Sequence, residues 1–398
     1  MSSVVPRAYA YLHSIPHKEL LNLLYDQDPD NDTCLFIDLD YLEFVYKKWC
    51  IAFPTIKPYY AMKCNPDKRI IQKLHALGAG FDCASSSEME QVRSYDVDAS
   101  NIILANTCKL PKDFKTAKAH NIQYMTFDNE YELSKILQYH PQSKLIMRIA
   151  CGDTNAKIPF GNKFGAQRDS WQYLITYAQS LGLTISGVSF HVGSGSNNHA
   201  AYTHALKDAS DLFQMLKENN YDPHILDIGG GFMYPLNNDV VYEVNQQIKL
   251  HFPNINVIAE PGRYFAENIV THYAKVVGKS KTHKNEFKYW IHDSIYGCFA
   301  DVSHGYLKPT IIPVNDICND NYIHKPLYKT TIYGSTCDGT DIIQDNIYMA
   351  EQHIGMWLCT PHMGAYTIVL ATPFNGMNFQ DIPRIYREHE HIHINPTH

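Results

Sequence analysis

The chain has 398 residues, which exceeds what one small core organises and predicts two domains. Hydrophobic residues make up 45% of the chain and charged residues 19%, which excludes a disordered protein. A net charge of -7 with no block of Lys and Arg argues against a nucleic-acid partner. No run of about 18 apolar residues predicts a membrane span.

The ten cysteines form no CxxC pair, so we expect no metal site. The first residues, MSSVVPRAYAYLHSIPHK, lack the apolar core of a secretory leader. Reduced thiols without a leader predict a cytoplasmic protein.

Residues 36–270 alternate short apolar runs with amphipathic segments. The candidate strands are 35–39, 59–63, 81–85, 102–106, 124–128, 145–149, 187–192, 225–230 and 257–260. Helical segments between them include 87–95, 130–139 and 201–219. Strands that alternate with helices form βα units, and eight or so units predict an α/β fold with a closed, TIM-type β/α barrel.

From residue 271 onward, short strands with polar turns replace the βα pattern. The candidate strands are 271–279, 287–293, 330–334 and 365–372. This pattern of short strands and polar turns predicts a mainly antiparallel β domain over 271–398. The pattern alone does not place residues 1–35, which we assign to the same domain.

Lys63 ends the apolar run YYAMK. A lysine at a strand end can point into the mouth of the barrel, where desolvation makes its amine nucleophilic and suited to a Schiff base. For this residue alone, a lysine that reaches solvent is the better interpretation.

Two glycine-containing turns follow later strands. His191 and Ser194 lie in SFHVGSGS, where the histidine can stack on a ring and the turn can bind phosphate. Gly229, Gly230 and Gly231 lie in LDIGGG, where the backbone can approach an anion closely. A core histidine and ordinary turns are the alternatives.

Glu260 and Arg263 share the motif EPGR after the last predicted barrel strand. A buried carboxylate keeps a pyridine nitrogen protonated, and the arginine can reach a phosphate. An internal Glu–Arg ion pair is the stronger interpretation in isolation. Asp82, Glu88 and Arg148 belong to the same rim, although a helix dipole alone explains Glu88.

In the β domain, Cys337 and Asp338 precede Gly339, and Tyr366 lies in GAYT. The thiol could donate a proton, the carboxylate could bind a cation and the tyrosine could bind phosphate; a turn and a core tyrosine are the alternatives. The joint order of these motifs supplies the parts that pyridoxal 5'-phosphate (PLP) requires.

With these motifs in this order, the chain resembles the ornithine decarboxylases and their relatives, the fold-type III PLP decarboxylases. The matching stretches are YYAMKCNP, GFDCASSSE, GVSFHVGSGS, LDIGGGF, AEPGRYF, YGSTCDGTD, MGAYT and FNG. The resemblance implies a barrel over 36–270, an alanine-racemase-like β domain from 1–35 and 271–398, and a homodimer with two shared active sites.

The resemblance also implies the roles of individual residues. Lys63 would hold PLP, His191 would stack on its ring and Glu260 would pair with the ring nitrogen. Cys337 would return a proton after CO2 leaves, and Asp338, with Tyr296 and Phe374, would bind the substrate. The remaining cofactor contacts would come from Asp82, Arg148, Ser194, Gly229, Gly230, Gly231, Arg263 and Tyr366.

Two departures from the family concern substrate binding and the dimer. His304-Gly305 stands where the ornithine enzymes carry Tyr-Asp, so one acid for the distal amine is missing unless Asp301 replaces it. His362 replaces an acid expected to pair with Lys163 across the dimer.

The resemblance favours ornithine as substrate, and the space at Gly305 keeps arginine and lysine as alternatives. A diaminopimelate decarboxylase is disfavoured because that branch carries a Cys-Glu-Ser-type motif where this chain has Cys-Asp-Gly. A non-catalytic relative of the antizyme-inhibitor kind is disfavoured because the cofactor motifs are complete. A racemase is disfavoured because its active-site tyrosine motif is not evident.

Overall fold

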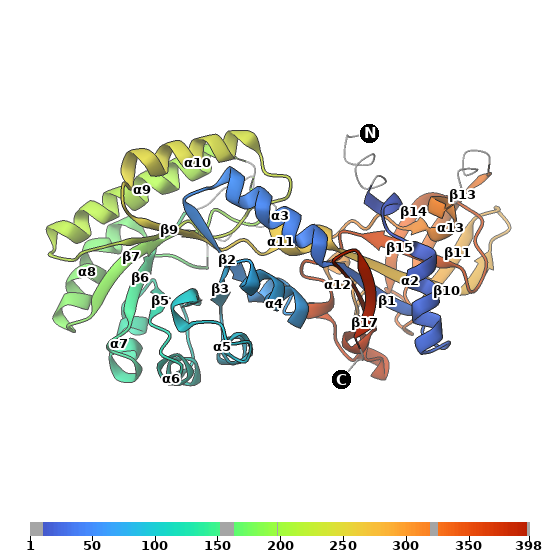
Figure 1. Ribbon diagram of the computed structural model, residues 1–398, viewed down its shortest axis with the longest axis horizontal. Helices are drawn as coiled ribbons and strands as arrows, with labels where there is room; N and C mark the ends of the chain where they lie inside the picture. The colour runs from blue at the N-terminus through green and yellow to red at the C-terminus, as the bar shows by residue number, and fades with distance from the viewer. Residues whose placement is uncertain (1–10, 152–162, 197, 319–324, 396–398) are drawn as a thin grey trace. The chain divides into compact units, whose positions relative to one another are not determined.

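The structure is a computed structural model that describes residues 11–151, 163–196, 198–318 and 325–395 (Figure 1). The chain divides into two compact units. Residues 43–265 form one, called the barrel unit below, and residues 1–42 with 266–398 form the other, called the β unit. Among the described residues, no helix is long and apolar enough to cross a membrane.

The barrel unit confirms the predicted closed barrel of eight parallel strands. Each strand pairs with the next one in sequence, and β2 pairs with β9 to close the ring. The strands are β2 (Ile56–Ala61), β3 (Gly80–Cys83), β4 (Ile102–Leu104), β5 (Tyr124–Phe127), β6 (Lys144–Arg148), β7 (Thr184–Ser189), β8 (Ile225–Asp227) and β9 (Asn256–Ala259).

Helices between these strands surround the barrel (Figure 1). Several begin at a side-chain cap: Asp67 before α4, Ser85 before α5 and Asn129 before α7 each accept a backbone N–H of the first turn. The helices are α3 (Leu39–Ala52), α4 (Lys68–Ala76), α5 (Ser86–Arg93), α6 (Pro111–Ala119), α7 (Glu130–Tyr139), α8 (Trp171–Ser180), α9 (His199–Glu218), α10 (Asn238–His251) and α11 (Arg263–Ala266).

The interior of the barrel is a packed apolar cluster. Its members are Tyr59, Ile103, Ile146, Ile225 and Ile258, from β2, β4, β6, β8 and β9. Successive side chains on a strand point to opposite sides, and each of these five strands gives one residue to the cluster. Reactive side chains are therefore expected at the ends of the strands, outside this apolar interior.

The β unit contains one nine-stranded sheet, mainly antiparallel as predicted. The order β14-β13-β11-β10-β1-β16-β17 forms its main path, and β15 pairs with β10 and β12. The β1–β16 and β11–β13 pairs are parallel. The strands are β1 (Thr33–Asp38), β10 (Val270–Lys281), β11 (Phe287–Ile291), β12 (Ile312–Pro313), β13 (Leu327–Tyr333), β14 (Ile342–Ala350), β15 (Trp357–Pro361), β16 (Arg384–Glu388) and β17 (His391–Asn395).

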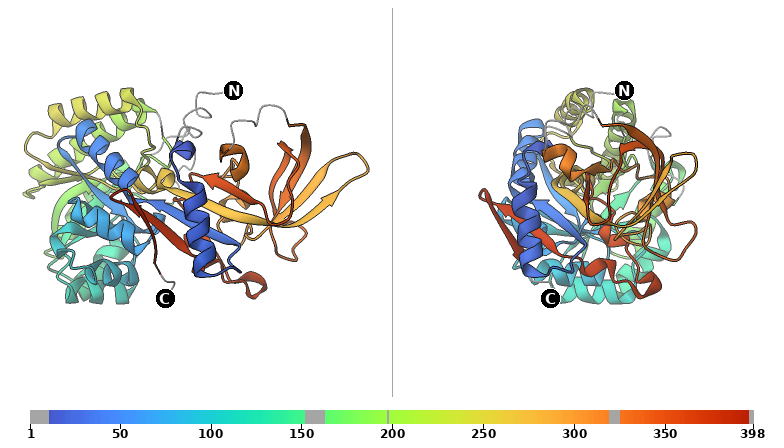
Figure 2. Two further views of the ribbon diagram at one scale, coloured as in Figure 1. Left: turned by 45° about the vertical axis from the view of Figure 1, so that its right-hand side comes forward. Right: turned by 90° about the vertical axis from the view of Figure 1, so that its right-hand side faces the viewer.

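Helix α2 (His17–Gln27) covers part of this sheet (Figure 2). Its Leu20 and Leu24 pack with Phe36 of β1 and Tyr273 of β10 in one buried cluster. Two further short helices, α12 (Ala300–Ser303) and α13 (Val314–Cys318), lie in the same unit.

Two strand predictions were wrong in detail. The run 35–39 was expected among the βα strands, but β1 pairs with β10 and β16 of the β unit. All six residues of β1 are buried, so its sequence looks like that of a barrel strand. The run 365–372 forms no strand: Tyr366 adopts φ 56°, and a 3-10 helix follows at Ile368–Leu370.

Candidate active site

Lys63 lies in a short 3-10 helix, Met62–Cys64, directly after β2. Its Nζ donates a hydrogen bond to Oδ2 of Asp82 on β3 at 3.0 Å. The lysine side chain is 49% exposed, whereas that of Asp82 is 2% exposed. A rigid, buried carboxylate thus holds an accessible amine at the end of the barrel.

Glu88 and Arg148 lie beside this pair. Oε2 of Glu88 accepts the backbone N–H of Ala84 at 2.5 Å, and burial raises the pKa of the carboxyl. Arg148 is the last residue of β6 and lies over the ring of Phe164, 4.9 Å from its centroid. The charges of Asp82 and Lys63 both act on the Glu88 carboxyl.

His191 follows β7 in a turn that fixes its ring. The backbone N–H of Gly193 donates to Nδ1 of His191 at 3.0 Å, so a neutral ring carries its proton on Nε2. Burial, and then the charges of Arg148 and Lys63, lower the pKa of the imidazole. Ser194 lies on the same turn, and Gly195 N donates to the carbonyl of Gly231 at 3.2 Å.

The three glycines after β8 lie too close to neighbouring backbone for side chains. A Cβ at Gly230 would stand 2.7 Å from the carbonyl oxygen of Glu260 and 2.9 Å from Nε2 of His191. A Cβ at Gly229 or Gly231 would overlap a carbonyl oxygen of the preceding turn, and both glycines have positive φ. The turn is therefore a backbone cradle that only glycine can form.

Glu260 follows β9 and presents a buried carboxylate. Within the described part of the chain, its Oε1 is buried and has no hydrogen-bond partner. Burial and the neighbouring Asp227 raise the pKa of Glu260. Asp227 also accepts the N–H of Gly229 at 2.8 Å, so it connects the glycine turn to Glu260. The sequence analysis did not single out Asp227, although it begins the motif DIGGG.

These groups fit PLP. A buried carboxylate oxygen without a donor matches a protonated ring nitrogen, the glycine turn offers backbone N–H groups for a phosphate, and Lys63 supplies the amine. Arg263 is the first residue of α11, three positions after Glu260, and is buried. All of these residues belong to the barrel unit.

In the β unit, a second cluster joins Tyr296, Cys337, Asp338, Phe374 and Asn375. The hydroxyl of Tyr296 donates to Oδ2 of Asp338 at 2.6 Å, and its ring stacks on Phe374 with centroids 4.0 Å apart. Cys337 N donates to Oδ1 of Asn375 at 3.0 Å, and Nδ2 of Asn375 lies 3.3 Å from the thiol. We call these five residues the Tyr296–Asp338 cluster.

The cluster contains an ionised acid. Hydrogen bonds from Tyr296, and then from Thr340, lower the pKa of Asp338, and the same bond raises the pKa of Tyr296. Cys337 is exposed. Asn375 was missed by the sequence analysis; the motif FNG could have indicated it.

Comparison with known proteins shows the family of this chain. The family described as "Pyridoxal-dependent decarboxylase, pyridoxal binding domain" matches residues 39–267. The chain belongs to the pyridoxal-dependent decarboxylases. Its cofactor is PLP.

Similar proteins include an antizyme inhibitor, an ornithine decarboxylase and an arginine decarboxylase. Antizyme inhibitor 2 of Xenopus laevis is 37% identical over 93% of this chain and 84% of its own length. Ornithine decarboxylase of Mus musculus is 35% identical over 90% of this chain and 80% of its own. The crystal structure of the arginine decarboxylase of Paramecium bursaria Chlorella virus bound to agmatine has a TM-score of 0.87 and 36% identity, covering 93% of this chain and 100% of that one.

The resemblance places one departure from the family around α12. Asp301 is buried, with Oδ1 4.0 Å from Nδ1 of His304, whose side chain is 63% exposed. Gly305 has φ 74°, and a Cβ there would meet nothing within 4 Å. The position that the resemblance gives to a second acid is therefore open space.

Tyr366 and His362 flank the motif MGA of the decarboxylase. Both have positive φ, 56° for Tyr366 and 63° for His362, and both are partly buried. Burial lowers the pKa of His362, so a neutral imidazole stands where the resemblance has an acid.

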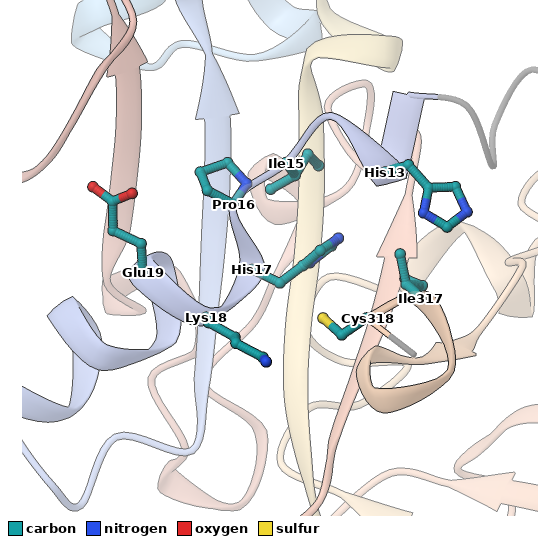
Figure 3. A pocket seen from close by; sticks show the side chains of 8 residues that line it. All are labelled: His13, Ile15, Pro16, His17, Lys18, Glu19, Ile317 and Cys318. Atoms are coloured by element: carbon teal, nitrogen blue, oxygen red, sulfur yellow. The ribbon is translucent and has the colours of Figure 1, made fainter. Parts of the chain in front are cut away.

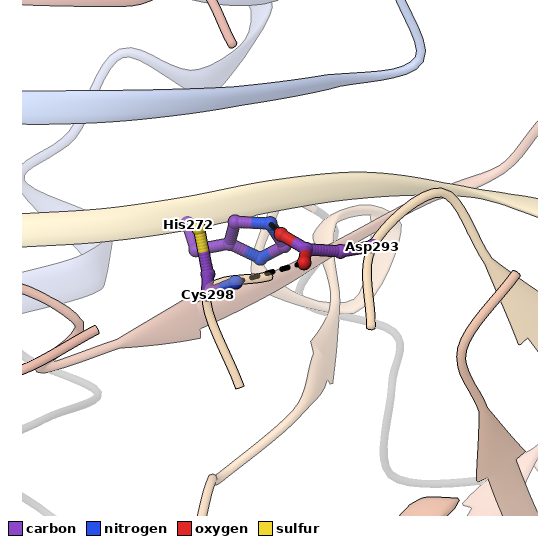
Figure 4. A group of neighbouring side chains, drawn as sticks. All are labelled: His272, Asp293 and Cys298. Carbon is purple, nitrogen blue, oxygen red and sulfur yellow. Dashed lines mark hydrogen bonds and ion pairs between the residues drawn. The ribbon is translucent and has the colours of Figure 1, made fainter. Parts of the chain in front are cut away.

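A buried group that the sequence analysis missed combines His272, Asp293 and Cys298 (Figure 4). Nε2 of His272 lies 2.7 Å from Oδ2 of Asp293. Thr33 Oγ1 donates its single hydrogen to the carbonyl of Tyr273, so its 3.2 Å contact with Nε2 requires a proton on that nitrogen. Nε2 is then no metal ligand. Burial, and then Asp293, raise the pKa of Cys298, which keeps the thiol protonated. Cys298 N donates to Oδ1 of Asp293 at 2.9 Å, whereas Oδ2 of Asp293 receives no hydrogen bond from the described residues.

A pocket of about 380 Å³ lies elsewhere in the β unit (Figure 3). Residues before and within α2 line it together with the end of α13, and His17 stands between Glu19 and Cys318 in the view of Figure 3. The complete lining is His13, Ile15, Pro16, His17, Lys18, Glu19, Ile317 and Cys318. None of the predicted site residues contributes to it.

Proposed function

We propose that this chain decarboxylates a basic amino acid with PLP, and that L-ornithine is the preferred substrate, giving putrescine and CO2. The observation that carries the proposal is the cofactor set of the barrel unit: the Lys63 amine, the glycine cradle and the buried Oε1 of Glu260 occur together. When bound, the cofactor supplies an electron sink for the bond that breaks.

In this proposal the barrel residues bind and orient the cofactor. Nζ of Lys63 holds it covalently, Glu260 keeps the ring nitrogen protonated and His191 covers the ring. Asp82 accepts from the Lys63 amine and keeps it in place. The phosphate and the surroundings of the ring are assigned to Arg148, Ser194, Gly229, Gly230, Gly231, Arg263 and Tyr366.

The Tyr296–Asp338 cluster would bind the substrate. The carboxylate of Asp338 is ionised and fixed by Tyr296 and Thr340, so it can pair with the distal ammonium of a basic amino acid. Phe374 holds the Tyr296 ring by stacking. The thiol of Cys337 would supply the proton that replaces the lost carboxylate at the α-carbon.

The choice among basic substrates rests on the region of α12. Asp338 is one acid for the distal cation, while Asp301 is buried next to His304 and Gly305 leaves open space. A buried cation requires an anionic partner, and Asp338 can supply it for ornithine. Arginine and lysine are the alternatives, because the open space could admit a longer side chain.

A second candidate is a non-catalytic protein, which the 37% identity to an antizyme inhibitor brings into consideration. The complete cofactor set argues for catalysis. We also propose a homodimer with shared active sites and a cytoplasmic location, both on the basis of the resemblance.

Two measurements on the purified protein test the proposal. The absorbance spectrum should contain a visible band from PLP bound to Lys63. Steady-state kcat/KM for ornithine, arginine and lysine should be highest for ornithine. A tenfold higher value for arginine or lysine would overturn the substrate and keep the chemistry, whereas no turnover of any of the three would support the non-catalytic candidate.

A further inference from the structure

We infer that Asp341 is a positioning residue that holds Tyr296 and Asp338 in the geometry needed to bind the distal cation of the substrate. The meaning of this inference rests on the proposed function. Asp341 lies next to β14, three residues after Asp338, and its side chain is directed away from solvent, with 1% of the residue exposed.

The carboxylate of Asp341 joins two loops. From the first loop, 293–298, Ser294 Oγ donates to Oδ2 at 2.9 Å and Ile295 N donates to Oδ1 at 3.0 Å. From the second loop, 334–338, Thr336 donates to Oδ2 through Oγ1 at 2.5 Å and through its backbone N–H at 3.2 Å. One buried carboxylate therefore receives four donors.

These two loops carry the two residues that meet in the cluster. The N–H of Tyr296 donates to Ser294 Oγ at 3.0 Å, and Ser294 donates in turn to Asp341. The N–H of Asp341 donates to the carbonyl of Asp338 at 3.1 Å. The 2.6 Å bond between the Tyr296 hydroxyl and Asp338 is thus the far side of a ring of hydrogen bonds that passes through Asp341.

Asp293, drawn with Cys298 in Figure 4, also holds the first loop and contacts the second. Its Oδ1 accepts Ser294 N at 2.6 Å and Cys298 N at 2.9 Å, and its carbonyl accepts Ser335 N at 3.0 Å. A Cβ at Gly297 would overlap Asp293 Oδ1, and a Cβ at Gly334 would overlap Asp341 Oδ2. Both loops are therefore folded tightly around an aspartate.

In this inference Asp341 does not bind the substrate itself but acts through Tyr296 and Asp338. Its oxygens are buried and already accept four hydrogen bonds, whereas Asp338 is only partly buried. The negative charge is required because each oxygen faces a backbone donor: Ile295 N at Oδ1 and Thr336 N at Oδ2. An asparagine would direct its NH2 group at one of these N–H groups in either orientation, which leaves a buried donor unsatisfied.

Binding to the PLP-loaded protein tests the inference without turnover. Calorimetry should compare putrescine with n-butylamine, which lacks the second ammonium. Asp341→Asn should weaken putrescine binding by roughly tenfold and leave n-butylamine unchanged, because the loss of a hydrogen bond to a charged group is of this order. Asp345→Asn, on the exposed part of the same strand β14, is the matched control and should bind both as the wild type does.

A double variant separates positioning from general damage. If Asp341 acts through Asp338, Asp338→Ala and the double variant Asp338→Ala/Asp341→Asn should have equal putrescine affinity. Three results would each overturn the inference. The double variant could bind putrescine more weakly than Asp338→Ala, Asp341→Asn could lose affinity for n-butylamine as much as for putrescine, or Asp341→Asn could bind putrescine as the wild type does.

Ser294→Ala is the milder variant if Asp341→Asn does not fold. It removes one bond of the ring and should weaken putrescine binding by about threefold, again without affecting n-butylamine; an unchanged affinity for putrescine would count against the inference. A wild-type protein that neither binds putrescine nor decarboxylates any basic amino acid would defeat the proposed function and this inference together, whereas failure in the variants alone defeats only the inference.

Discussion

The cofactor set of the barrel unit and the Tyr296–Asp338 cluster of the β unit are built in different ways. The first relies on backbone: the turn of Gly229 to Gly231 excludes side chains, and strand ends position Lys63 and Glu260. The second relies on side chains from separate loops, with Tyr296, Asp338 and Phe374 held by one another.

This difference fits the positions at which the resemblance places departures from the family. A backbone cradle tolerates almost no substitution, because any Cβ at Gly229 or Gly231 overlaps a carbonyl oxygen. Side-chain recognition can change by single substitutions, as at His304, Gly305 and His362. In the proposed function, the cofactor contacts can therefore stay fixed in the barrel unit while side chains of the β unit adjust substrate choice.

The largest effect should come from Lys63→Ala, which removes the amine that we propose holds the cofactor. We expect loss of the visible absorbance band and of nearly all turnover. Lys57→Ala is the control, because Lys57 lies on β2, the strand that precedes Lys63, and donates to Asn101 instead. A Lys63 variant that keeps both the band and the activity would disprove the role of this lysine.

Asp338→Ala should affect substrate binding and leave the cofactor in place. We expect kcat/KM for the preferred substrate to fall roughly 10²-fold, or about 3 kcal/mol, because the distal cation loses its partner. Asp301→Ala should leave kcat/KM close to the wild-type value, since Asp301 is buried beside His304. Equal losses in the two variants would mean that Asp301 also binds the substrate.

Cys337→Ala should retain the absorbance of PLP while slowing or misdirecting the final proton transfer. Product analysis checks this, because the normal amine formed at the normal rate would exclude the thiol as donor.

The same variant tests the shared site. Mixed dimers of Lys63→Ala and Cys337→Ala chains should recover part of the activity, since one of two hybrid sites would be intact. Mixtures that never exceed their parents, once subunit exchange is established, would contradict a shared site.

Gly305→Asp should raise the preference for ornithine over lysine several-fold. The added acid would have room, since a Cβ meets nothing within 4 Å, although φ 74° imposes some strain that Asp tolerates better than most residues. The ratio of kcat/KM for ornithine to that for lysine should rise. A falling ratio would place position 305 away from the distal cation.

The smallest effect concerns pH and the stability of the protein without cofactor. Burial raises the pKa of Asp227 and Glu260, so the folded state binds more protons than the unfolded state between the ordinary and the raised values. Stability should therefore fall as pH rises from about 4 through the raised pKa of each group. Chemical denaturation at several pH values should give a flatter profile for Glu260→Gln; an identical profile would contradict this account.

The proposed cofactor residues were accessible to sequence reasoning because each lies at the end of one strand. Lys63, His191, the three glycines and Glu260 each follow a short apolar run, and parallel barrel strands bring such ends to one rim. The alternation of strands and helices likewise predicted the barrel, because its period is a property of neighbouring residues.

Only the tertiary structure decided the partners of distant residues. Strand β1 reads as a barrel strand but pairs within the β unit, since complete burial removes the pattern that would separate the two cases. Ser294 and Asp341 are 47 positions apart, and Tyr296 and Asp338 are 42 apart. No local pattern marks such pairs, because the hydrogen bonds that join them form only when the sheet brings the two loops together.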